Sequence, residues 1–186
     1  MHKTLLLLFI LSFTLSAKAQ IDGKFMEGSY TDTLGNRYKG LIKLTVAVGG
    51  TLFSPKTHLT YKENKTAFEK EVAIYEAKSF TMAADSFVIS RNPGLKKVPV
   101  LMVMLDTPVK IYFTRFLAHG NFLLTTKENL YLIGEDPDRL AEITRKNFKE
   151  IMSHIMGDKP QILANIQNGL YRYGDLDDMI KTYKTR

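Results

Sequence analysis

The sequence contains no cysteine. Disulfides, thiol nucleophiles, cysteine-ligated zinc and iron–sulfur clusters are therefore excluded together, and so is the lipid-bearing cysteine of a bacterial lipoprotein. Histidine is scarce, with four residues in 186, and no two of them stand at the spacing of a zinc-binding helix. The sequence predicts neither a metal site nor a cofactor.

Catalytic motifs are also missing. There is no Gly-x-Ser-x-Gly turn for a serine nucleophile, and no glycine-rich loop precedes a helix to cradle phosphates. Two clusters of acids could suggest acid–base chemistry, but both fall where helices are expected to begin, and acids there cap free N–H groups. These clusters are 135–136 and Asp175, Asp177 and Asp178. No catalytic residue is predicted.

Long apolar runs and blocks of like charge are absent beyond the N-terminus. The longest later run, 98–105, contains Pro99 and has the length of a strand. A membrane-spanning helix needs about 20 apolar residues, so no transmembrane segment is expected in the mature chain. No block of five like charges occurs, which argues against nucleic acid as a partner.

The N-terminus has the organisation of a signal peptide. Lys3 precedes an apolar stretch over 5–15, and Ala17 and Ala19 form an Ala-x-Ala cleavage site before Gln20. The alternative is a membrane anchor, for which about eleven apolar residues are too few. We expect residues 1–19 to be removed and the product to be exported, either periplasmic, outer-membrane-associated or secreted.

Cleavage would remove two lysines and no acid, lowering the formal net charge from +7 to +5. This excess suits anionic lipid headgroups or lipopolysaccharide phosphates as ligands. The alternative is that scattered lysines serve solubility alone.

Residues 20–134 show a period of two, interrupted by turn residues, which indicates short antiparallel strands. The expected strands are 28–32, 38–48, 58–62, 72–75, 80–82, 86–90, 98–105 and 109–114, followed by a hairpin of 122–126 and 130–133 that turns at 127–129. Residues 34–36 and 92–94 read as turns. A curved sheet, a sandwich and a partly closed barrel all fit this pattern.

The period changes to 3.6 in residues 135–186. Asp136-Pro137 reads as an N-cap for a helix carrying Leu140 and Ile143, with a break near Thr144. Three apolar stripes follow at helical spacing, the second behind a capping-box pattern at 158–161. The stripes are Phe148, Ile151, Met152 and Ile155; Ile162, Leu163 and Ile166; and Leu176, Met179, Ile180 and Tyr183. The expected class is α+β, with strands first and about three short amphipathic helices packed on the sheet or as a small appendage.

Two features could support binding. Tyr171-Arg172-Tyr173 lies between the last two expected helices, and aromatic and arginine residues are enriched at interaction hot spots. The alternative is that the tyrosines staple the helix junction. Met102 and Met104 could line an apolar pocket, although ordinary core packing is the favoured explanation for them.

Several stretches together resemble uncharacterised exported proteins of Bacteroidetes-type Gram-negative bacteria. They are the Ala-Gln signal end, Gly28-Ser29-Tyr30, Gly35, 39–43, Asn147-Phe148-Lys149, the Gly-Asp-Lys-Pro junction at 157–160, and Asp175-Leu176 with Ile180 and Tyr183. The resemblance implies export and a β-region followed by a helical end. It implies no activity and no functional residue.

The function expected from these observations is a non-enzymatic periplasmic or outer-membrane-associated binding or accessory module. Its partner would be an envelope protein or an anionic or lipidic ligand. One alternative is a carrier that holds an apolar, lipid-like ligand in a β-barrel-like cavity. A hydrolase is the third possibility.

Overall fold

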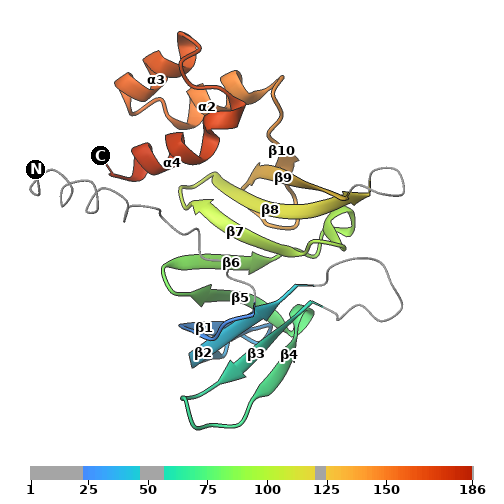
Figure 1. Ribbon diagram of the computed structural model, residues 1–186. Helices are drawn as coiled ribbons and strands as arrows, with labels where there is room; N and C mark the ends of the chain where they lie inside the picture. The colour runs from blue at the N-terminus through green and yellow to red at the C-terminus, as the bar shows by residue number, and fades with distance from the viewer. Residues whose placement is uncertain (1–22, 47–56, 120–124, 186) are drawn as a thin grey trace, which may run out of the picture.

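The computed structural model describes residues 23–46, 57–119 and 125–185, with the backbone alone described at 116–119 and 125–128. The described residues form one antiparallel sheet followed by three short α-helices, so the predicted α+β class is confirmed (Figure 1). The strands are β1 Met26–Asp32, β2 Arg37–Thr45, β3 His58–Lys62, β4 Lys70–Ala73, β5 Ala77–Met82, β6 Asp85–Ile89, β7 Val100–Leu105, β8 Lys110–His119, β9 Thr125–Gly134 and β10 Ala141–Glu142. The helices are α2 Phe148–Ile155, α3 Pro160–Gln167 and α4 Leu176–Thr185.

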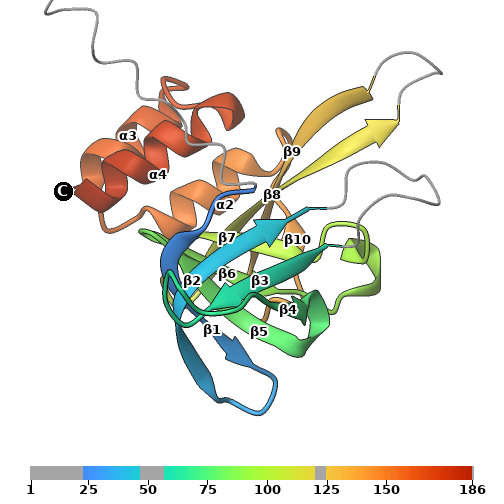
Figure 2. The ribbon, with the colours of Figure 1, turned by 60° about the horizontal axis from the view of Figure 1, so that its bottom comes forward.

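The sheet is open, with the order β10-β9-β8-β7-β6-β5-β1-β2-β3-β4. Its N-terminal half must nevertheless be strongly curled. β4 and β5 are four positions apart, a separation of about 19 Å in a flat sheet, yet only the 3₁₀ turn Ile74–Glu76 joins them. The four steps from Ala73 to Ala77 can span at most ~14 Å. β4 therefore returns toward β5, as Figure 2 shows.

Two paired glycines permit this curl. Gly28 in β1 lies opposite Gly40 in β2. A Cβ on Gly28 would collide with the backbone carbonyl of Thr81 in β5, and one on Gly40 with that of Lys62 in β3. Because glycine has no Cβ, the neighbouring backbones can approach at both positions.

The inside of the curl is a packed hydrophobic core. Its largest nearly inaccessible members are Tyr30, Ile42, Leu59, Phe80 and Met82, each 2% exposed or less. The core includes the stacked rings of Phe80 and Phe87, 4.7 Å apart between centroids. The burial of these apolar side chains is the main contribution to the stability of the N-terminal half of the sheet.

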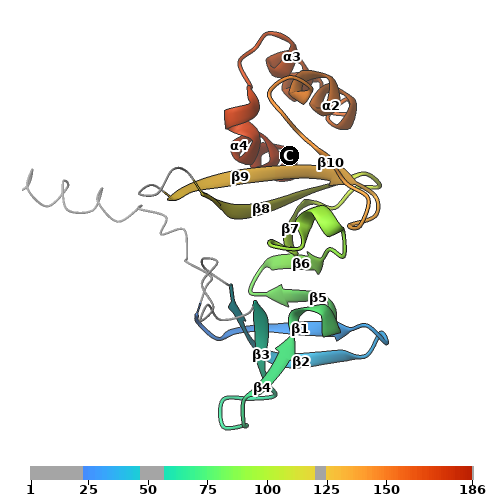
Figure 3. The same ribbon diagram turned by 90° about the vertical axis from the view of Figure 1, so that its right-hand side faces the viewer.

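The helices cover the other end of the sheet, over β8 and β9 (Figure 3). Their apolar stripes share one core with the strands, to which Leu105, Ile111 and Tyr131 contribute from the sheet. The helical members are Phe148, Met152, Met156, Ile162, Ile166, Leu176, Met179 and Ile180. On the opposite face of the same strands, alternation places a smaller core of Leu95, Leu101, Tyr112 and Leu132. No helix among the described residues is long and apolar enough to cross a membrane.

Most expected strands occur, but the last hairpin was predicted wrongly. Residues 127–129, expected to turn, lie inside β9, where Lys127, Glu128 and Asn129 pair with Leu117, Phe116 and Arg115. A polar stretch in a long antiparallel strand resembles a turn when the partner strand is unknown. The strand expected over 72–75 also ends early, at Ala73, where the 3₁₀ turn begins.

The helix expected after Asp136-Pro137 is wrong as well. The Asp136 carboxylate accepts the N–H of Asp138 (2.9 Å), which makes a local turn in place of a helix cap. The segment then passes the edge of the sheet as β10. Leu140 consequently packs against the core of one face and Ile143 joins the helix-covered core of the other.

The capping box expected at 158–161 is also not formed. Lys159 is the N-cap of α3 and makes no side-chain capping bond. The Asp158 carboxylate instead accepts a hydrogen bond from the hydroxyl of Tyr183, 3.1 Å from each oxygen. This contact ties the end of α4 to the junction of α2 and α3.

Candidate binding site

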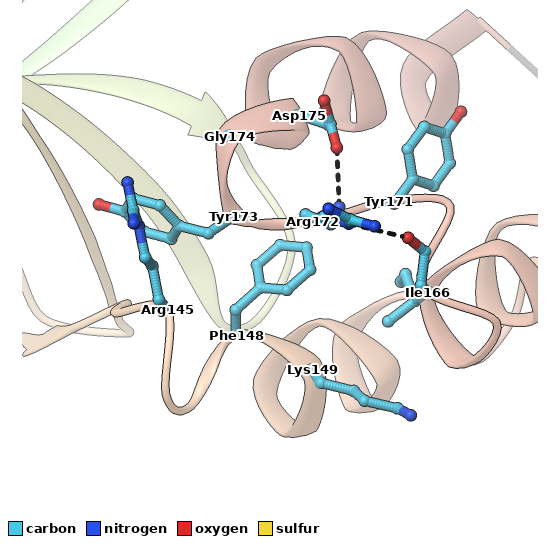
Figure 4. Close-up of a pocket in the computed structure, with 10 residues that line it drawn as sticks. Arg145, Phe148, Lys149, Ile166, Tyr171, Arg172, Tyr173, Gly174 and Asp175 are labelled. Atoms are coloured by element: carbon cyan, nitrogen blue, oxygen red, sulfur yellow. Dashed lines mark hydrogen bonds between the residues drawn. The ribbon is translucent and has the colours of Figure 1, made fainter.

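A hollow of about 550 Å³ opens at the helical end of the molecule, and we call it the helix-end hollow (Figure 4). It lies between the start of α2, the end of α3 and the loop that leads into α4. Its lining residues are Arg145, Phe148, Lys149, Ile166, Gly169, Tyr171, Arg172, Tyr173, Gly174 and Asp175.

The loop over 168–175 is held by its own hydrogen bonds. Gly169 takes a positive φ of 73° at the end of α3, a conformation that favours glycine. The N–H groups of Leu170 and Tyr171 both donate to the carbonyl of Asn165, at 2.9 and 3.1 Å. The Asp175 carboxylate accepts the N–H of Arg172 (2.8 Å). Asp175 therefore fixes the loop before α4, whereas the sequence predicted it as the cap of α4 itself.

The floor of the hollow is apolar and continuous with the helix-covered core. Phe148 and Ile166 are 4% and 1% exposed. Tyr171 and Tyr173 are half-buried and pack against the same core. The ring of Tyr173 meets that of Tyr131 edge-on, with 5.7 Å between centroids. The two loop tyrosines thus both line the hollow and anchor it.

Tyr131 sits beneath this floor and ties the sheet to α4. Its hydroxyl donates to the carboxylate of Asp177, 3.0 Å away. Burial, and then the negative charge of Asp177, raise the pKa of Tyr131 well above its ordinary value. Burial also raises the pKa of Tyr173, with Glu142 adding to the shift and Arg145 opposing it.

The rim of the hollow is cationic. Arg145, Lys149 and Arg172 are all exposed. The Arg172 Nε donates to the carbonyl of Gly169 (3.2 Å), and the Lys149 Nζ to that of Gln167 (3.1 Å). None of the three takes part in the ion pairs found among the described side chains. The single acid of the lining, Asp175, is already bound to the loop backbone.

The structure brings the three residues of the predicted interaction patch, Tyr171, Arg172 and Tyr173, into one site. It adds Arg145, Phe148 and Lys149, which the sequence did not single out as binding residues. These precede the patch by more than twenty residues, and only the packing of α2 against α3 brings them together. The predicted cleavage residues Ala17, Ala19 and Gln20 lie outside the described residues.

Met102 and Met104 belong to core packing. Met102 packs against the core inside the curl and Met104 against the helix-covered core. Neither methionine lines the helix-end hollow or the second hollow described next.

A second hollow of about 630 Å³ lies over β5, β6 and the segment after β9. Its lining carries both signs of charge, and part of that charge is already paired, as in the contact of Lys110 with Asp106. No group of three or more His, Asp or Glu side chains within the described ranges could hold a metal ion. Of the two hollows, the helix-end hollow has the clearer chemical bias.

The helix-end hollow therefore offers hydrophobic contact at its floor and hydrogen-bond donors at its rim. Its lining contains no serine, histidine or glutamate. Such a surface suits noncovalent recognition of a ligand that combines apolar and anionic groups. Comparison with protein-family models, curated proteins and solved structures finds no match for this chain.

Proposed function

We propose that this protein is an exported, non-enzymatic binding or accessory module of the bacterial envelope that recognises its partner through the helix-end hollow. The observation that carries the proposal is the set of three exposed cations, Arg145, Lys149 and Arg172, around an aromatic floor. Tyrosine and arginine are the residue types that dominate binding energy at protein interfaces. The signal-peptide pattern of residues 1–19 and the resemblance to exported proteins support the location.

The filled interior of the curled sheet favours a module over a carrier. Ile42, Leu59 and Phe80 are 0–2% exposed and belong to the one hydrophobic core inside the curl. A carrier of the kind expected from the sequence would use that space for its ligand. The helix-end hollow, by contrast, is open to a partner.

The proposal is tested by affinity capture from a membrane and periplasm extract. Immobilised mature wild type is compared with Arg145→Ala/Arg172→Ala and with a control, Lys65→Ala/Arg139→Ala, which removes the same charge from exposed sites outside the hollow. Surface substitutions of this kind usually change stability by less than about 0.5 kcal/mol. The wild type and the control should recover a partner that the hollow variant loses. Recovery of the same proteins by all three would contradict the proposal.

A further inference from the structure

The shape of the helix-end hollow favours a side chain as its occupant. The loop over 168–175 is held by hydrogen bonds to Asn165 and Asp175, so the concavity is largely preformed. Its most buried members, Phe148 and Ile166, are apolar and nearly fully buried. A preformed apolar depression with polar groups only at its rim is the usual receptor for one inserted anchor side chain.

The charge of the rim favours acids next to that anchor. The lining holds three cations, Arg145, Lys149 and Arg172, and one acid, Asp175, whose carboxylate already accepts the N–H of Arg172. An arginine guanidinium can bind a carboxylate through two parallel hydrogen bonds, which adds direction to the charge attraction. Arg145 and Lys149 stand at the start of α2 and Arg172 in the loop before α4, so acids on both sides of one apolar residue would meet cations from two separate segments.

A peptide fits this arrangement better than a bilayer does. Proteins bind a bilayer surface through apolar side chains that project outward. Leu170, which is 70% exposed beside the hollow, is a side chain of that kind. The floor residues Phe148 and Ile166, in contrast, are almost fully buried in the lining of the hollow, where a flat headgroup layer would not reach them. A chain segment can insert a side chain there and place its acids at the rim.

We infer that the helix-end hollow binds an acidic peptide segment that carries a large apolar side chain, with that side chain over Phe148 and the flanking carboxylates on Arg145, Lys149 and Arg172. This inference rests on the proposed function, because it names the chemistry of the partner that the module would recognise.

The test uses a defined probe, a fluorescently labelled peptide in which two acids stand on each side of a phenylalanine, and measures binding by anisotropy. Replacing the phenylalanine by alanine should weaken binding ~10- to 150-fold, which is the equivalent of the ~1.5–3 kcal/mol for burying such a side chain. Replacing the acids by their amides should weaken it as well. Raising the ionic strength from ~0.05 to ~0.3 M should weaken the binding of the acidic peptide and leave the affinity of the amide peptide unchanged.

The protein variants locate the binding on the molecule. Arg145→Ala/Arg172→Ala should bind the acidic peptide ~2- to 30-fold more weakly than the wild type, as expected for the loss of two exposed charge pairs. The control Lys65→Ala/Arg139→Ala, with the same change in net charge, should bind as the wild type does. An equal loss of affinity in both variants would show that only the net charge of the protein matters, and it would overturn the inference.

Four further outcomes would overturn it. Two concern the peptides: equal affinity for the amide peptide, and no binding of the acidic peptide at all. The other two are binding of phosphatidylglycerol vesicles that requires Arg145 and Arg172, and self-association that requires them. If envelope capture still depends on these two arginines while the peptide fails, the proposed module stands and only the ligand class is wrong. If capture does not depend on them, the module proposal itself fails.

Discussion

Replacing Met179 by alanine tests whether α4 is an integral part of the fold. The side chain of Met179 is 0% exposed and belongs to the core that the helices share with β7, β8 and β9. Truncating a buried methionine to alanine costs ~2–5 kcal/mol, because apolar contacts are lost and a cavity remains. For a chain of this length each kcal/mol lowers the melting temperature by ~2–4 °C, so the expected loss is ~4–20 °C.

The assay is urea and thermal unfolding followed by circular dichroism, with probes of both strand and helix content. Lys181→Ala is the control, since this neighbour on the same helix is exposed and its loss should change stability by less than about 0.5 kcal/mol. A single cooperative transition, shifted only in Met179→Ala, is expected. An unchanged midpoint, or a separate early transition of the helices, would refute the shared core.

Three other predictions follow from particular contacts. The pKa of Tyr131 is raised in the folded protein, so the unfolded chain, with an ordinary tyrosine pKa of 10.0, releases this proton at lower pH. The free energy of unfolding should therefore fall above about pH 10, with Tyr131 contributing up to ~1.4 kcal/mol per pH unit. Unfolding titrations at alkaline pH should show a flatter slope for Tyr131→Phe. Gly28→Ala should destabilise the sheet by ~1–3 kcal/mol, because the added Cβ would collide with the carbonyl of Thr81. Gly157→Ala is the control, since a Cβ there makes only ordinary contacts. The midpoints of urea unfolding of the two variants and the wild type test this difference. N-terminal sequencing of protein from native cells should begin at Gln20, and an intact Met1 would refute cleavage.

The strands and the three amphipathic helices were predictable because their signals are local. The alternation in β2 and the stripe of Met152 and Ile155 in α2 need no knowledge of distant residues. The errors came where local and tertiary signals compete. Asp136-Pro137 has a good helix-start pattern, but Leu140 and Ile143 serve cores on opposite faces of the sheet, which a helix could not achieve here.

The overall form of the sheet was not predictable from local pattern. A sandwich, a partial barrel and a curved open sheet share the same alternation of residues. What decides among them is the pairing of β5 with β1 and the short link from β4 to β5, both long-range features. Gly28 and Gly40, which allow the curl, are readable as a pair only once the register is known.

Half of the side chains proposed for recognition at the helix-end hollow were predictable from the sequence. Tyr171, Arg172 and Tyr173 adjoin in sequence, so their chemistry is visible as a cluster. Arg145 and Lys149 flank Phe148, which the sequence shows as a core residue, and nothing local links them to the later loop. Their role as rim cations emerges only from the packing of α2 against α3.

The most direct test of recognition through the helix-end hollow is hydrogen–deuterium exchange on the mature protein, free and bound to the captured partner. We predict slower exchange on binding at 145–149 and 166–175, with β1 to β5 unchanged. Protection confined to the sheet, with both helix-end segments unaffected, would contradict the assignment of this hollow as the recognition site.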